Sequence, residues 1–267
     1  MTIPAMPKTL ELRQEIDIAL QIWKELLEDK AIDYAYVTGS AVKPWDSMID
    51  YVPEISDVDL HLKFTTDTRY MFTDLQEVSE MTQYYETRFY EQIPEAIHLP
   101  RFQLVHLNPN LRNDQFTPPY RKDIRVLFGH PKIPPMDDEA QIRSVDRQLL
   151  QGLDEIIDKL PDMLIDRNGY QLWIPLRRLN WRISPSVIRL LSQKVEQPSL
   201  LWANNRTGTY RQAIELGYDK IAELFKQYYL RCWDLFQSDM QDTRIYFEIF
   251  TTIAELFENI RAEISTV

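Results

Sequence analysis

Tyr36-Val37-Thr38-Gly39-Ser40 and, after a spacer, Ser56-Asp57-Val58-Asp59-Leu60-His61-Leu62 are the two stretches that decide the fold of this chain. Each reads as a β-strand, and the Gly-Ser pair reads as a tight turn that ends the first strand. Because side chains alternate between the two faces of a strand, Asp57 and Asp59 point to one face and the apolar residues between them to the other. We therefore expect a strand–turn–strand unit in which two carboxylates share one face of a sheet.

Two carboxylates on one strand face lie roughly 7 Å apart and repel each other unless a cation sits between them. Mg²⁺ suits this arrangement, because it takes one or two protein carboxylates and fills its other positions with water and phosphate oxygens. Gly39 can adopt backbone angles that other residues avoid, so the chain can turn sharply there and present amides to an anion. The pattern predicts a site for metal and phosphate, although a solvated strand end beside a turn would also accommodate Asp57 and Asp59.

The two stretches together resemble the nucleotidyltransferase superfamily related to DNA polymerase β, whose signature is a strand, Gly-Ser, a spacer and Asp-x-Asp on the next strand. The chain looks most similar to the bacterial aminoglycoside adenylyltransferases, in which Gly-Ser-Ala-Val is common, and here that motif is Gly39-Ser40-Ala41-Val42. Residues 124–131 resemble a further strand and turn of the same branch. The resemblance covers about the first half of the chain.

This resemblance implies a reaction in which a hydroxyl attacks the α-phosphate of a nucleoside triphosphate and pyrophosphate leaves. Asp57 and Asp59 would hold two Mg²⁺ ions, and Gly39 and Ser40 would cradle the terminal phosphates. ATP is the expected donor, and the expected acceptor is a small molecule such as an aminoglycoside-like antibiotic.

The family usually carries a third carboxylate on a neighbouring strand, where it binds metal or acts as the general base. The matching strand here, residues 101–107, contains no acid, and Gln103 aligns with the missing residue. Glutamine can orient a hydroxyl but cannot accept its proton at neutral pH. Either the base lies elsewhere, with Glu91, Glu95 and Asp114 as distant candidates, or catalysis is impaired. His106 is a less suitable base, because alternation places it on the face opposite Gln103.

Three more side chains are candidates for contact with a ligand. His61 shares the face of Asp57 and Asp59, where it would contact substrate, hydrogen-bond Asp59 or serve as a partly buried structural residue. Arg178 and Arg182 share a helix face at a spacing of four residues. They would bind triphosphate, as basic residues of the helical domain do in several relatives, or pair with the surplus carboxylates of this chain.

Composition sets further limits on function. The 267 residues are 44% hydrophobic and include only 6 glycines, which favours an ordered and mainly helical protein. The formal net charge of −11 argues against a nucleic-acid partner. The same charge is compatible with a cationic substrate or simply with solubility. We find no signal peptide, no membrane-spanning apolar run and a single cysteine, Cys232, so we expect a cytoplasmic protein with one buried thiol and no membrane partner.

The order of elements predicts an α+β fold, namely a nucleotidyltransferase-type mixed β-sheet with flanking helices followed by an all-helical C-terminal domain. Pro131, Pro134 and Pro135 mark the boundary, giving domains 1–135 and 136–267. In the first domain we expect helices at 9–30 and 70–93 and strands at 32–37, 57–64, 101–107 and 124–128. In the second we expect helices at 138–160, 170–183, 184–191, 209–216, 218–237 and 239–264.

The first functional hypothesis is thus a Mg²⁺-dependent nucleotidyltransferase that moves AMP from ATP to a small-molecule hydroxyl. An acceptor hydroxyl on a protein side chain or an RNA end is a variant of it. The alternative is a catalytically impaired nucleotide-binding or protein-interaction module of the same fold. A third class, a helical adaptor without a nucleotide site, would make the two aspartates accidental. The sequence does not determine the oligomeric state or which nucleobase the nucleotide carries.

Overall fold

A computed structural model describes residues 3–113, 116, 119, 123–133 and 138–265. The chain divides into two compact units. The sheet unit comprises Met6–Pro44 and Ser56–Pro135. The helical unit comprises Met1–Ala5, Trp45–Ile55 and Met136–Val267.

The sheet unit is built on a mixed sheet with the strand order β3-β2-β1-β4. Its strands are β1 (Ile32–Thr38), β2 (Val58–Phe64), β3 (Phe102–His106) and β4 (Arg125–Phe128). β1 is antiparallel to both β2 and β4, whereas β2 and β3 are parallel. The prediction of a mixed sheet with flanking helices is therefore confirmed.

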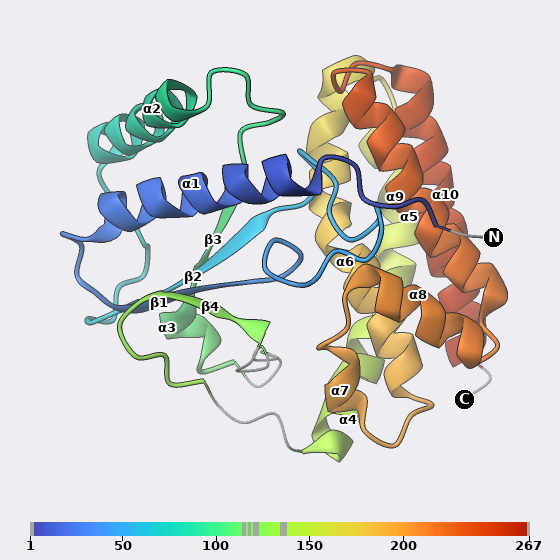
Figure 1. Cartoon of the computed structure of the whole chain (residues 1–267). Coiled ribbons are helices and arrows are strands. Elements are labelled where there is room, and N and C mark those ends of the chain that lie inside the picture. The colour runs from blue at the N-terminus through green and yellow to red at the C-terminus, as the bar shows by residue number, and fades with distance from the viewer. Residues whose placement is uncertain (1–2, 114–115, 117–118, 120–122, 134–137, 266–267) are drawn as a thin grey trace. The chain divides into compact units, whose positions relative to one another are not determined.

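Helices α1 (Thr9–Leu27) and α2 (Leu75–Gln92) lie on the same side of this sheet, as Figure 1 shows. They meet in a small core cluster of Ala19, Ile22, Tyr85 and Phe89, against which Phe102 of β3 packs. The alternate residues of β2 that include Val58 and Leu60 are fully buried. This apolar face leaves the opposite face of β2 for the polar residues Asp59 and His61.

The opposite face of the sheet carries a second cluster. Tyr34 and Tyr36 of β1 pack with Leu107, the first residue of the short helix α3 (Leu107–Asn110). The sequence Asn108-Pro109-Asn110 is typical of a turn, and the structure has one helical turn there. Asn108 holds this turn in place, because its side chain accepts from Phe64 N at 2.9 Å and donates to Phe64 O at 3.1 Å.

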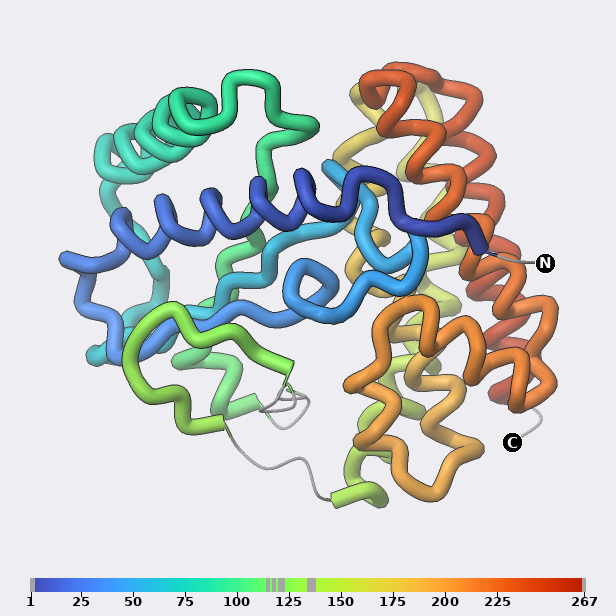
Figure 2. Tube along the Cα trace, in the orientation of Figure 1, coloured from blue at the N-terminus to red at the C-terminus, as the bar shows by residue number. Residues whose placement is uncertain are grey.

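The helical unit confirms the prediction that the C-terminal region is helical. Its α-helices are α4 (Glu139–Gln151), α5 (Leu153–Leu164), α6 (Trp173–Ser192), α7 (Pro198–Leu201), α8 (Arg206–Glu215), α9 (Asp219–Gln237) and α10 (Thr243–Ile264). Helices α9 and α10 run side by side (Figure 2) and contribute much of the core. Cys232 on α9 is fully buried, as expected, and burial raises the pKa of its thiol to about 12.

The connection between β1 and β2 belongs largely to the helical unit. Asp50, which is 1% exposed, holds this connection in the helical unit through hydrogen bonds. Its carboxylate accepts hydrogen bonds from Ser47 N at 3.0 Å, Thr207 N at 2.8 Å and Thr207 Oγ1 at 2.7 Å. Trp233 Nε1 adds a bond to Met48 O at 2.6 Å. Part of the stretch assigned to domain 1–135 is thus held by partners that lie far along the chain, which no local pattern reveals.

Several predicted helix ends differ from the structure because of caps and prolines. Helix α2 begins at Leu75 rather than near residue 70, since Asp74 caps the amides of Gln76 and Glu77. The predicted helix 138–160 is broken at Gly152, and Pro161 lies inside α5 instead of ending it.

Most of the two predicted segments 170–183 and 184–191 forms the single helix α6, which runs through Pro185, while residues Gly169–Leu172 form a short 3-10 helix before it. Buried residues before and after this proline, such as Ile183 and Val187, outweigh the lost backbone hydrogen bond. Helices α1 and α10 also differ from their expected bounds by a few residues at one end, and α8 differs at both ends.

None of the helices in the described ranges has the combination of length and apolarity needed to span a bilayer.

Candidate functional site

The turn after β1 is shaped by Gly39. Its φ is +82°, in the left-handed region that glycine occupies at little cost. A Cβ atom built at this position would lie 2.3 Å from Asp59 Oδ2, so the glycine backbone is seated directly against the Asp59 carboxylate. The conformation therefore favours glycine here, and a larger residue would also force the Asp59 carboxylate to shift.

Arg13 of α1 holds the residues that follow this glycine. Its guanidinium donates to Ala41 O at 2.6 Å and to Lys43 O at 2.5 Å. The carbonyl of Gly39 in turn accepts from the amides of Val42 and Lys43, both at 3.3 Å. Ser40 is half-buried within the turn that these bonds define. Sequence reasoning missed Arg13, because its partners lie nearly thirty residues further along the chain.

Three polar residues stand in one row across the sheet. Thr38 of β1 is the register partner of Asp59 of β2, and Asp59 is the register partner of Gln103 of β3. Register partners on neighbouring strands share a face, so these side chains lie beside one another. Gln103 is exposed and Asp59 is half-buried. Gln103 is thus the residue of β3 that lies beside Asp59.

Asp57 has a partner that sequence reasoning missed. Its carboxylate forms an ion pair with the guanidinium of Arg101, and the two side chains are only 11% and 16% exposed. The amide of Val58 donates to Arg101 O at 2.8 Å, which fixes the start of β3 beside the start of β2. The signal was a basic residue opening the strand that carries Gln103. The repulsion expected between Asp57 and Asp59 is therefore reduced by a cation from the chain itself.

His61 lies two residues beyond Asp59 and is 7% exposed. Its ring stacks on Tyr36, with ring centroids 4.8 Å apart, and its Nδ1 has no hydrogen-bond partner among the described residues. Burial lowers the pKa of His61 to about 4, so its imidazole is neutral at pH 7. His61 is thus more deeply buried than the partly buried residue that the sequence suggested as one alternative.

The depressed pKa of His61 predicts that acid destabilises the sheet unit. The unfolded chain binds a proton near pH 6.5, whereas the folded chain binds it only near pH 4, so stability is present above pH 6.5 and is lost as the pH falls towards 4. Between pH 7 and pH 5 the loss from this group is about 2 kcal/mol. His61→Phe keeps the stacking and removes the titration.

Urea unfolding of wild type and His61→Phe at both pH values measures the effect, and the difference between the two proteins cancels the contributions of the other acids and bases. We expect the free energy of unfolding of His61→Phe to fall by about 2 kcal/mol less than that of wild type. Equal losses in the two proteins would contradict the burial of a neutral imidazole.

Arg178 and Arg182 lie on α6 in the helical unit. Arg178 is exposed, and Arg182 donates to Arg178 O at 3.1 Å while lying over the Trp181 ring at 4.1 Å. Burial lowers the pKa of Arg182. Within the described ranges neither arginine forms an ion pair with a carboxylate, so the alternative role of pairing with surplus acids is not observed.

The candidate bases are dispersed. Glu91 is exposed on α2 and pairs with Arg88, and Glu95 is exposed beyond the end of that helix. Asp114 lies outside the described residues. His106 faces Phe64, with its ring 5.3 Å away in an edge-on contact, which matches its predicted place on the face opposite Gln103.

One further acid, Asp123, approaches the strand that carries Thr38. Thr38 Oγ1 donates weakly to Asp123 O at 3.5 Å, and Asp123 Oδ2 is buried without a hydrogen-bond partner among the described residues. Asp123 lies between the predicted strands 101–107 and 124–128, so no strand pattern pointed to it.

The donor set at this end of the sheet suits Mg²⁺ only in part. Asp57 and Asp59 supply the one or two carboxylates that Mg²⁺ takes from proteins when phosphate and water complete its shell. The described residues contain no group of three or more His, Cys, Asp or Glu side chains able to hold a metal by themselves. The residues therefore fit Mg²⁺ bound jointly with a phosphate ligand, and they do not form an all-protein metal cage.

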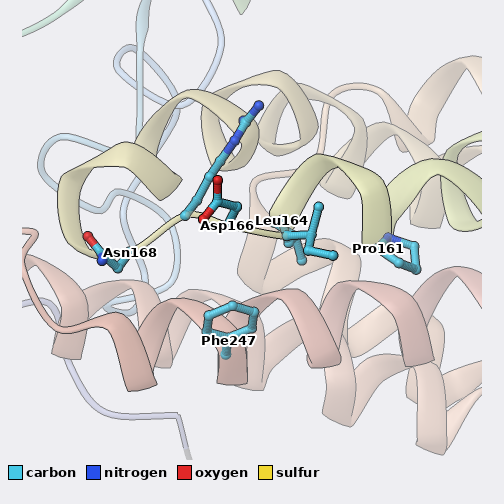
Figure 3. Close-up of a pocket in the computed structure, with 7 residues that line it drawn as sticks. Pro161, Leu164, Asp166, Asn168 and Phe247 are labelled. Carbon is cyan, nitrogen blue, oxygen red and sulfur yellow. The ribbon is translucent and has the colours of Figure 1, made fainter.

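A surface pocket of about 500 Å³ lies elsewhere, in the helical unit. Figure 3 shows Pro161 and Leu164 of α5, Asp166 and Asn168 of the next loop and Phe247 of α10 around it. None of the predicted site residues lines it, and its walls combine apolar side chains with one acid and one arginine. It is distinct from the candidate site and carries no recognisable catalytic arrangement.

Comparison with protein-family models, with curated proteins and with solved structures found no match to this chain. The fold and the site thus define an α+β protein with a mixed four-stranded sheet, a polar sheet end and a helical C-terminal region.

Proposed function

We propose that this protein is a Mg²⁺-dependent nucleotidyltransferase that uses ATP and transfers AMP to a hydroxyl of a small molecule. The observation that carries the proposal is the seating of Gly39 against the Asp59 carboxylate. A glycine turn places backbone close to the carboxylate, as is needed where phosphate and its metal ion meet the chain. If Asp59 were only a solvated residue at a strand end, it would not need to contact the Gly39 backbone.

In this proposal Asp59 and Asp57 would hold Mg²⁺ together with the phosphates, and Gly39 and Ser40 would contact the terminal phosphates. When bound, the metal would neutralise charge on the phosphoryl oxygens and orient the triphosphate. Gln103, beside Asp59 in the row across the sheet, would orient the attacking hydroxyl.

The second candidate function is a nucleotide-binding or protein-interaction module that has lost turnover. Two observations favour it. Gln103 occupies the place next to Asp59 where a proton acceptor is needed, and Arg101 neutralises Asp57. Under this reading the protein binds Mg²⁺ and ATP without releasing pyrophosphate.

Asp59→Asn is the sharpest test of the site. The change removes the carboxylate charge and keeps its shape, and it leaves the Asp57–Arg101 pair intact. Calorimetric titration of ATP with and without Mg²⁺ should show metal-dependent binding to wild type, weakened in the variant by about tenfold or more. Asp33→Asn is the matched control, because Asp33 is an exposed aspartate on the neighbouring strand β1.

Pyrophosphate release with a panel of hydroxyl acceptors then separates the two functions. Release from wild type that is lost in Asp59→Asn supports transfer, whereas metal-dependent binding without release from any acceptor supports the impaired module. Asp123→Asn is included to learn whether that carboxyl group affects turnover. Equal ATP binding by wild type and Asp59→Asn, or no binding by either, would overturn the proposal.

A further inference from the structure

Arg101 occupies the place beside Asp57 where the sequence pattern predicts a metal cation. The ion pair is largely shielded from water, since the two side chains are 16% and 11% exposed. Electrostatic attraction between shielded charges is stronger than between solvated ones. Asp57 therefore already has a well-placed counter-ion when no ligand is bound.

The backbone keeps this counter-ion in position. The bond from Val58 N to Arg101 O, at 2.8 Å, joins the residue after Asp57 to Arg101 itself. From there β2 and β3 run parallel in register, with Val58 beside Phe102 and Asp59 beside Gln103. The guanidinium that pairs with Asp57 thus belongs to the same end of the sheet as Asp59.

We propose that Arg101 is a resident counter-ion that keeps divalent metal off Asp57 until a phosphate-bearing ligand takes the guanidinium. A divalent cation approaching Asp57 meets a fixed positive charge, which opposes its binding. A planar guanidinium also pairs well with phosphate oxygens, so phosphate can compete with Asp57 for Arg101. Metal and nucleotide then bind together rather than singly. The displacement of Arg101 by a phosphate-bearing ligand rests on the proposed function, whereas the exclusion of metal by Arg101 does not.

The test uses Mn²⁺ alone as the probe, measured by calorimetry on the full chain. Arg101→Gln should bind Mn²⁺ more tightly than wild type by about tenfold or more, because the opposing charge is gone. Arg101→Lys is the matched control that keeps the charge, and it should bind as weakly as wild type. Asp57→Asn/Arg101→Gln should lose the gain, because the freed carboxylate is then absent.

Thermal unfolding shows whether each variant is folded and gives a second measure of metal binding. Added Mn²⁺ should raise the melting temperature of Arg101→Gln and leave that of wild type nearly unchanged, since a ligand stabilises the state that binds it. Mn²⁺ binding to wild type as tight as to Arg101→Gln would overturn the counter-ion role. So would equally weak binding and no thermal shift in both proteins.

The two proposals fail in distinguishable ways. If wild type does not bind ATP with Mg²⁺, the proposed function fails, while the comparison with Mn²⁺ alone still decides the counter-ion role. If ATP enhances Mn²⁺ binding to wild type and Arg101→Gln gains nothing for Mn²⁺ alone, the proposed function stands and the role of Arg101 is rejected. Enhancement of Mn²⁺ binding by ATP in wild type, reduced in Arg101→Gln, is the result expected if both hold.

Discussion

Gly39→Ala should destabilise the sheet unit by about 2–4 kcal/mol and weaken any ligand binding that depends on Asp59. Two costs combine. An alanine strains the backbone at a φ of +82°, and its Cβ would lie 2.3 Å from Asp59 Oδ2, closer than two such atoms can approach. The measurement is hydrogen exchange of the β1 and β2 amides, which reports on the sheet unit directly.

Gly217→Ala supplies a matched control for the first of these costs. Gly217 has the same φ of +82°, but no atom lies within 4 Å of a Cβ built there. Its replacement should cost only the conformational part, about 1–2 kcal/mol, in the helical unit. An effect of Gly39→Ala no larger than that of Gly217→Ala would show that the carboxylate is not seated against the glycine.

The double variant Gly39→Ala/Asp59→Ala isolates the contact itself. Removing the Asp59 carboxylate leaves Asp59 Cβ, 3.8 Å from the new methyl carbon, as the nearest atom of that side chain. The two changes should therefore be less damaging together than the sum of their separate effects, by about 1–2 kcal/mol. Strict additivity would mean that residues 39 and 59 do not interact.

Asp50→Ala should be the most destabilising single change in the helical unit, at about 3–4 kcal/mol. The carboxylate accepts four hydrogen bonds, two from Thr207 and one each from the amides of Asp46 and Ser47. Truncation would leave several buried donors without partners in a place that water does not reach. Urea unfolding followed by tryptophan fluorescence measures the loss, because Trp233 bonds to Met48 in the same segment.

Asp46→Ala is the control on the same segment. Asp46 is exposed, and its carboxylate accepts one hydrogen bond, from Asn205 Nδ2 at 3.0 Å. Its loss should cost less than about 1 kcal/mol. Comparable effects of the two changes would contradict the anchoring role of Asp50, and a small effect of Asp50→Ala alone would mean that the segment is held by its other contacts.

Local patterns correctly predicted the parts of the fold that depend on short-range physics. The alternation of apolar and acidic residues from Asp57 to Leu62 placed one set in the core and left Asp59 on the other face. The loss of strand patterns beyond residue 136 predicted the helical C-terminal region. The positions of Gly39 and Asp59 followed from a turn glycine and a side-chain period of two.

Partners that lie far apart in the sequence could not be predicted in this way. Arg13 and Arg101 have no local feature that distinguishes them from other surface arginines until the tertiary structure supplies the carbonyls and the carboxylate that they bind. Proline normally disfavours the interior of a helix, but residues buried on both sides of Pro185 allow α6 to continue through it.

The sequence by itself determined that one strand ends at a glycine turn and that a later strand carries Asp59 on the face opposite its buried apolar residues, because backbone sterics and side-chain alternation act over a few residues. Only the tertiary structure decided that Gly39 touches Asp59, that Arg101 neutralises Asp57 and that Asp50 fastens the intervening segment to the helical unit. Those three contacts join residues about twenty to more than 150 positions apart. Such partners meet only when the chain folds, so no local pattern of residues can identify them.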